Sequence, residues 1–78
     1  MPKYNLLDTV VLKHDLPDVK LKGGDLGVVV ERYEPDGLEV EFVKPSGETL
    51  AVVTLTEHEV RPVGATDIIT VRTLTRAA

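Results

Sequence analysis

The most strand-like pattern in the chain is the segment LKGGDLGVVVERY at residues 21–33. Its Gly-Gly-Asp sequence at residues 23–25 is typical of a tight turn, because glycine tolerates positive φ and aspartate forms local hydrogen bonds. Val28, Val29 and Val30 follow in succession, which predicts a central strand covered on both faces. Gly27 lies inside this strand, so we expect a bulge or a close backbone contact there, where the strand bends between two sheets.

A first strand is predicted at residues 9–12, TVVL, from its β-branched content. The preceding lead-in, residues 1–8, is expected to place Leu6 or Leu7 on the body of the domain. Residues 13–24 form a long connection, and its apolar residues Leu16, Val19 and Leu21 predict a loop that packs back on the core.

Two hairpin turns, at residues 34–37 and 44–47, bound a cleanly alternating segment. Its residues Leu38, Val40 and Phe42 are expected to face the core, with the intervening glutamates in water. Both turns contain proline and glycine, the strongest local turn signals. This part of the chain therefore predicts a meander of antiparallel strands.

The next strand is predicted at residues 49–55, TLAVVTL, where the alternation is less decisive. We expect Ala51, Val53 and Leu55 to face inward. That choice leaves Leu50 and Val52 on the opposite face, where another component is able to cover them.

A single helical turn is predicted at residues 56–59, with Thr56 and Glu59 forming a capping box. A short last strand follows at residues 60–62, and Pro62 favours an edge position. The order of these elements predicts an all-β fold, a small SH3-like five-stranded barrel over residues 1–62 with one short helical turn.

The remaining residues, 63–78, form a β-prone C-terminal tail outside the barrel pattern. Ile69 and Val71 lie on one side of this extended segment, and Ile68 and Leu74 lie on the other. Such a segment pairs with the edge of its own barrel, pairs with a neighbouring molecule, or folds on a partner. Pairing with its own barrel is the arrangement that we expect first, and the other two stay open.

Composition limits the possible functions. The chain has 78 residues, 42% hydrophobic and 28% charged, the balance of one ordinary globular domain. It has no cysteine, which excludes disulfides and thiolate sites and fits a cytoplasmic location. No apolar run has the length of a membrane span, so we expect a soluble protein.

The formal charge of −4 is unevenly distributed. Residues 1–62 hold seven Lys or Arg and twelve Asp or Glu, which gives −5, whereas the tail carries two Arg and one Asp, which gives +1. An acidic body repels phosphate backbones, so nucleic acid is an unexpected partner.

No residue constellation indicates catalysis. The two histidines, His14 and His58, lack a neighbour at metal-ligand spacing, although His58 lies between Glu57 and Glu59. No nucleophile elbow is present, and no phosphate-binding glycine motif follows residues 23–24. We therefore expect a protein without enzymatic activity, cofactor or metal.

Several blocks of the sequence together resemble the bacterial DUF4926 family. They cover residues 5–63, and the most specific are GDLGVVVE, from Gly24, and VEFV, from Val40. The resemblance implies a small SH3-like barrel with no established activity. It also suggests a gene arrangement similar to that of toxin and antitoxin pairs. Residues 21–33 are in addition similar to the KOW motif of ribosomal proteins and transcription factors.

Two functions follow as hypotheses. The first is a non-enzymatic protein-interaction module that binds a protein partner or a second copy. A specific form of this hypothesis is that the chain is the antitoxin or accessory half of a two-gene pair. Its candidate contact residues are Leu50, Val52, Ile68, Ile69, Val71 and Leu74. The alternative is a KOW-like nucleic-acid-binding barrel. Its candidate contact residues are Lys13, Lys20, Lys22, Arg32 and Tyr33.

Overall fold

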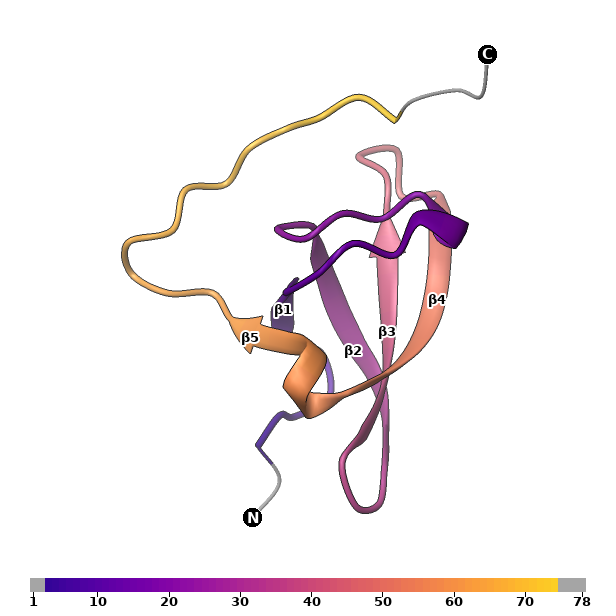
Figure 1. Cartoon of the computed structure of the whole chain (residues 1–78), viewed down its shortest axis with the longest axis vertical. Helices are drawn as coiled ribbons and strands as arrows, with labels where there is room; N and C mark the ends of the chain where they lie inside the picture. The colour runs from indigo at the N-terminus through magenta and orange to yellow at the C-terminus, as the bar shows by residue number, and fades with distance from the viewer. Residues whose placement is uncertain (1–2, 75–78) are drawn as a thin grey trace.

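The computed structural model describes residues 3–74 and contains five strands and two short 3-10 turns (Figure 1). The elements are β1 (Thr9–Leu12), η1 (Pro17–Val19), β2 (Leu26–Tyr33), β3 (Gly37–Val43), β4 (Thr49–Thr56), η2 (Glu57–Glu59) and β5 (Val60–Pro62). Over residues 3–74, no helix has the length and apolar character needed to span a membrane.

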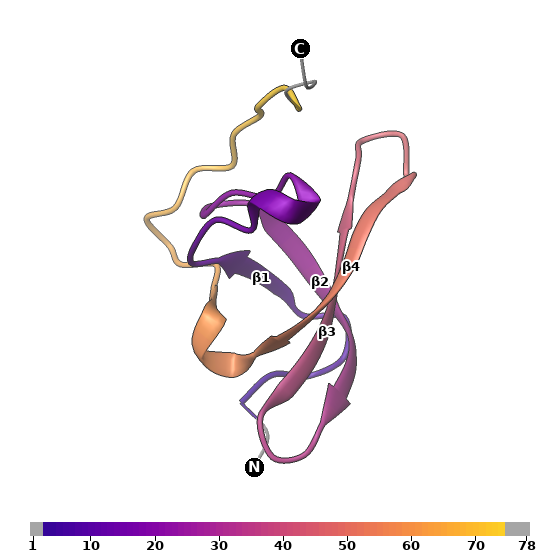
Figure 2. The same ribbon diagram turned by 45° about the vertical axis from the view of Figure 1, so that its right-hand side comes forward.

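The strands form one antiparallel sheet in the order β4-β3-β2-β1-β5. The all-β class and the five-stranded order that the sequence predicts are confirmed. The sheet curls around the core, as Figures 1 and 2 show, but it does not close. Strands β4 and β5 are its two edges, and Pro62 lies on an edge strand as expected.

Strand β2 is the central strand, pairing with β1 at one end and with β3 along the rest. Its register with β3 shifts between Val29 and Glu31, so Val30 is the extra residue of a bulge. The bulge therefore lies beyond Gly27, where the sequence placed the bend. Gly27 has a different role: a Cβ there would lie 2.5 Å from Val40 Cγ1 and 2.9 Å from Phe42 Cε1.

The core lies inside the curved sheet, and β3 contributes three of its ten buried residues, β1 two, and β2, β4 and β5 one each. The alternation predicted for β3 is confirmed, since Leu38, Val40 and Phe42 are at most 2% exposed. The prediction that β2 is covered on both faces is wrong. Val29 is fully buried, whereas Val30, the bulge residue, is 36% exposed.

The lead-in contributes an aromatic residue to the core. Tyr4 is 3% exposed, whereas Leu6 and Leu7 are 49% and 76% exposed. The expectation that a leucine anchors this segment is therefore wrong. Arg32 Nη1 donates a hydrogen bond to the Tyr4 carbonyl at 3.2 Å, which fixes the lead-in against the end of β2.

For strand β4, the prediction of the core-facing residues is confirmed, and the prediction for the opposite face is wrong at Leu50. Leu55 is buried, and Val53 packs against the core from the same face. The β3–β4 register shifts between Phe42 and Val43, which makes Leu50 the extra residue on β4. Leu50 consequently packs against the core, and of the predicted outer pair only Val52, 49% exposed, stays outside.

The 13–24 loop and the second 3-10 turn match their predictions. Leu21 is buried, and Leu16 and Val19 pack against the core, so the loop folds back on the body. The Thr56 amide donates to Glu59 Oε1 at 2.9 Å, one bond of the predicted capping box at η2.

Candidate interaction surface

Residues 63–74 of the C-terminal tail leave β5 and arch past the loop of residues 13–25 between β1 and β2 without joining the sheet (Figures 1 and 2). Within its described part, residues 63–74, the one backbone hydrogen bond joins the Asp67 amide to the Gly64 carbonyl at 3.1 Å. Residues 63–74 therefore form no strand pair with their own sheet, which differs from the arrangement that we expect first. Two arginine contacts hold the tail instead.

The first contact is between Arg61 in β5 and Asp67. Arg61 Nη1 and Nη2 donate to the two carboxylate oxygens of Asp67 at 2.8 Å and 2.9 Å, a bidentate pair. The Gly64 amide donates to the same carboxylate. Arg61, and after it this amide, lower the pKa of Asp67 to about 2. The pair closes a turn that redirects the chain as it leaves the sheet.

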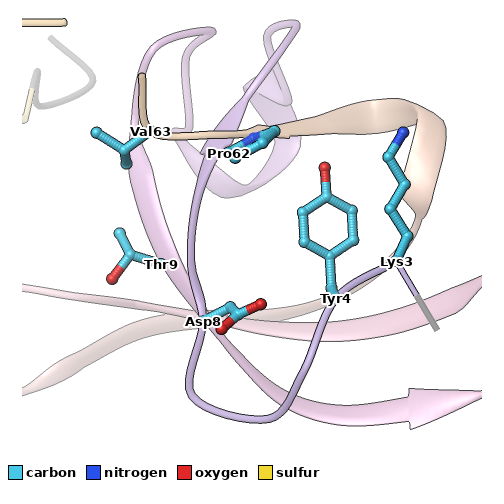
Figure 3. Close-up of a pocket in the computed structure, with 6 residues that line it drawn as sticks. All are labelled: Lys3, Tyr4, Asp8, Thr9, Pro62 and Val63. Carbon is cyan, nitrogen blue, oxygen red and sulfur yellow. The ribbon is translucent and has the colours of Figure 1, made fainter. Parts of the chain in front are cut away.

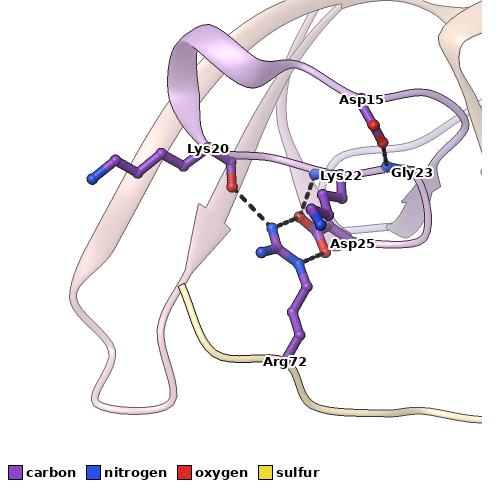
Figure 4. Close-up of polar contacts among 6 residues, drawn as sticks. All are labelled: Asp15, Lys20, Lys22, Gly23, Asp25 and Arg72. Carbon is purple, nitrogen blue, oxygen red and sulfur yellow. Dashed lines mark hydrogen bonds and ion pairs between the residues drawn. The ribbon is translucent and has the colours of Figure 1, made fainter. Parts of the chain in front are cut away.

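The second contact ties Arg72 to the 13–25 loop, the whole connection between β1 and β2 (Figure 4). Arg72 Nε donates to Asp25 Oδ1 at 2.8 Å, and Nη2 donates to the other Asp25 oxygen and to the Lys20 carbonyl. The Lys22 amide also donates to Asp25, at 2.8 Å. Arg72 is the main cause of the lowered pKa of Asp25.

The loop presents these acceptors because its own backbone is fixed. Lys20 ends η1 in the left-handed region at φ 62°, and the Gly23 amide donates to Asp15 Oδ1 at 2.9 Å. The Asp25 carbonyl accepts the Leu12 amide at 2.9 Å, which anchors the loop to β1. Asp25 and the Lys20 carbonyl therefore form a preorganised site for a guanidinium group.

Between the two contacts the tail exposes large apolar side chains. Ile68, Ile69 and Val71 are 87%, 75% and 88% exposed, and Leu74 is half-buried. The sequence identified all four as contact candidates, and the structure gathers them on one extended segment. Apolar side chains clustered in this way typically mark a contact surface.

Strand β4 offers unpaired backbone groups at the edge of the sheet. The Thr56 amide bonds to the Glu59 carboxylate and so faces away from β3. Because backbone groups alternate between the two sides of a strand, those of Thr54 and Val52 face the same way. Among the residues that the structure describes, no backbone group pairs with them.

The β4 edge also lacks the usual protection against strand addition. Its eight residues, TLAVVTLT, include no charged residue and no proline. Two carboxylates on the neighbouring β3 flank its outer face. Thr54 Oγ1 donates to Glu39 at 2.7 Å, and Thr49 Oγ1 donates to Glu41.

The residues proposed for nucleic-acid binding do not form one patch. Lys13, Lys20 and Lys22 belong to the 13–25 loop, whereas Arg32 and Tyr33 end β2 beside the 34–36 turn, at the opposite end of the sheet (Figure 1). The surroundings of Tyr33 are acidic, since Glu39, and to a lesser extent Glu31, raise its pKa.

Two shallow hollows flank the tail. One lies between the lead-in and the start of the tail and is lined by Lys3, Tyr4, Asp8, Thr9, Pro62 and Val63 (Figure 3). The other lies under Arg72, at the 13–25 loop. In the described chain, no three His, Asp or Glu side chains gather as metal ligands would.

His14 connects the 13–25 loop to η2. Its Nε2 lies 2.9 Å from Glu59 Oε2, and its Nδ1 lies 3.1 Å from the Asp15 carbonyl. The hydrogen bond to Glu59 is the main cause of the raised pKa of His14. His58, between two glutamates in sequence, has no part in this contact.

Comparison with known proteins assigns most of the chain to a family. The sequence model of DUF4926, a domain of unknown function, matches residues 6–62. No curated protein and no solved structure matches the chain. The matched region ends at the last residue of β5, so the tail and its two anchoring residues Asp67 and Arg72 lie beyond it.

Proposed function

The chain belongs to DUF4926, a domain of unknown function, and we propose that it is a non-enzymatic protein-interaction module whose tail is the binding element. The observation that carries the proposal is the exposure of Ile68, Ile69 and Val71 on an extended segment without strand pairing. Burying each of these side chains on a partner would contribute about 1.5–3 kcal/mol.

Strand addition is the binding mode that suits the tail. An extended segment adds to an exposed sheet edge through main-chain hydrogen bonds, and its alternate side chains provide specificity. The bidentate contact between Arg61 and Asp67 fixes the course of the chain at the start of the tail before binding. The tail is thereby partly ordered in the free protein, so it loses less conformational entropy on binding, which favours association.

We propose that the partner is a small protein encoded by a neighbouring gene, and that this chain is the antitoxin or accessory half of the pair. The support is the exposed tail, which needs a partner of its own, together with the resemblance to DUF4926. The charge of the tail, opposite in sign to that of the body, suits a partner with an acidic edge.

The nucleic-acid alternative receives no comparable support. Lys22 lies beside Asp25, and Arg32 donates a hydrogen bond to the Tyr4 carbonyl. The positive charges are therefore divided between the two ends of a body that is acidic as a whole.

Co-purification tests the proposal. The full-length chain and its Ile68→Ser/Ile69→Ser/Val71→Ser variant are each co-expressed with the neighbouring gene product. We expect the tail variant to lose the partner. The matched control is Leu7→Ser, because Leu7 is 76% exposed but lies in the lead-in and not in the tail. Equal retention of the partner by the tail variant and the wild type would contradict the proposal.

A further inference from the structure

We infer that the tail also binds a second copy of this chain, by adding as an antiparallel strand to the free edge of that copy's β4. The inference rests on the proposed function, and it identifies one partner and the surface that receives the tail. Each copy carries both elements, so two copies exchange their tails symmetrically and form a closed dimer.

The backbones of the two elements are complementary. Strand β4 has eight residues, and the β-prone part of the tail, residues 67–74, has the same number. The groups of Val52 and Thr54 that face away from β3 are free to bond to a further strand. An uncharged edge of this length is normally covered, and in the described chain no element pairs with it.

The apolar faces of the two elements are also complementary. On the core-facing side of β4, Ala51 and Val53 are only half-buried, so the core is incomplete at this edge. Ile69 and Val71 lie on the same face of an extended tail, because side chains alternate along a strand. Placed beside β4, these two residues cover Ala51 and Val53 of the second copy and extend its core.

Charge fixes which face of the tail is turned outward. Arg72 lies on the opposite face from Ile69 and Val71, and the outer face beside β4 carries Glu39 and Glu41. In the dimer Arg72 leaves Asp25 of its own chain and approaches these carboxylates of the second copy. Asp25 of the same chain and the two glutamates of the second copy therefore compete for the Arg72 guanidinium group.

Sedimentation velocity of the full-length chain over a wide concentration range tests this inference. We expect a reversible monomer–dimer equilibrium. Val71→Ser and Ile68→Ser form a matched pair, since the two side chains are 88% and 87% exposed. Val71→Ser, on the face turned to the core, should raise the dimer Kd about tenfold or more, and Ile68→Ser less than about threefold.

Three further variants test whether the free edge of β4 receives the tail and whether Asp25 competes with the second copy for Arg72. Val52→Pro removes an amide that faces away from β3, so we expect the hydrogen bonds between β3 and β4 and the melting temperature to stay unchanged. The same substitution should abolish the dimer, because that amide can no longer bond to the added strand. Asp25→Asn, which frees Arg72, should lower the dimer Kd, whereas Glu41→Gln should raise it.

The results separate this inference from the proposed function. A strict monomer at every concentration would overturn the inference and leave the co-purification test of the proposed function intact. Equal effects of Val71→Ser and Ile68→Ser would show unspecific association and would also overturn it. So would a dimer that survives Val52→Pro in a variant that still melts cooperatively.

Discussion

Arg72 and Asp25, which are 47 residues apart in sequence, are joined by a hydrogen bond of 2.8 Å from Nε to Oδ1. This contact explains how an extended tail without strand pairing keeps a defined course beside the sheet. It is also weak enough to be exchanged, because an ion pair near the surface contributes only about 0–1 kcal/mol. The tail is thus held in the free chain and can be released to a partner.

Replacing Arg72 by alanine should release the end of the tail and leave the barrel intact. We expect backbone order parameters of residues 68–74 to fall below about 0.6, the range of flexible segments, when measured by NMR relaxation. The free energy of unfolding should change by less than about 1 kcal/mol. Unchanged order in the tail would show that other contacts hold it.

The Asp67 carboxyl should titrate with a pKa of about 2, below its ordinary value of 3.8. A lowered pKa means that the contact with Arg61 is fully stabilising above pH 3.8 and is lost as the pH falls through about 2. NMR titration of the carboxyl carbon measures this value. In the Arg61→Ala variant the pKa of Asp67 should rise, and an unchanged value would contradict the account of this contact.

His14 should titrate above its ordinary pKa of 6.5. The contact with Glu59 therefore stabilises the folded loop fully below pH 6.5, and this contribution is lost as the pH rises through the raised pKa. Glu59→Gln should lower the pKa of His14, measured from the ring proton shifts. An unchanged pKa of His14 in that variant would contradict the contact described here.

Gly27→Ala should destabilise the fold through overpacking. The added Cβ would lie 2.5 Å from Val40 Cγ1, closer than packed atoms approach, and we expect a cost of about 1–3 kcal/mol. Gly64→Ala is the matched control, because its nearest neighbour would be at 3.4 Å and the change should stay within about 0.5 kcal/mol. Urea unfolding measures both, and equal stabilities would contradict the packing described for Gly27.

Tyr4 is expected to stabilise the fold through its ring more than through its hydroxyl. The ring is 3% exposed, whereas the hydroxyl lies 3.4 Å from the Val60 carbonyl, at the long end of hydrogen bonding. Tyr4→Ala should cost about 3–5 kcal/mol, as truncating a buried aromatic ring does. Tyr4→Phe should cost less than about 1.5 kcal/mol. Similar losses in the two variants would show that the hydroxyl matters most.

The strands could be predicted from the sequence because each depends on local patterns. The alternation of Leu38, Val40 and Phe42 fixes one face of β3, and Thr56 with Glu59 marks the helical turn. These signals need only neighbouring residues. Bulges do not give such a signal, so the packing of Leu50 against the core was not predicted. The exposure of Val30 was not predicted either, because a run of three valines does not show whether both faces of a strand are covered.

The candidate surface could be predicted only in part. The apolar, β-prone composition of the tail identified Ile68, Ile69 and Val71 as candidate contact residues. The partners of Arg61 and Arg72 could not be predicted, because a charge pair formed across a folded loop leaves no local pattern. The sequence also could not show which lysines and arginines lie together, because that depends on the direction of β2.

Amide hydrogen exchange of residues 68–74 in the dilute full-length chain tests the central claim most directly, namely that the tail is an unpaired strand in the free protein. The account predicts exchange close to that of an unfolded peptide for Ile68, Ile69 and Val71, beside slow exchange of the β3 amides. Strong protection of these tail amides in the dilute monomer would show that the tail pairs with its own sheet and would contradict the account.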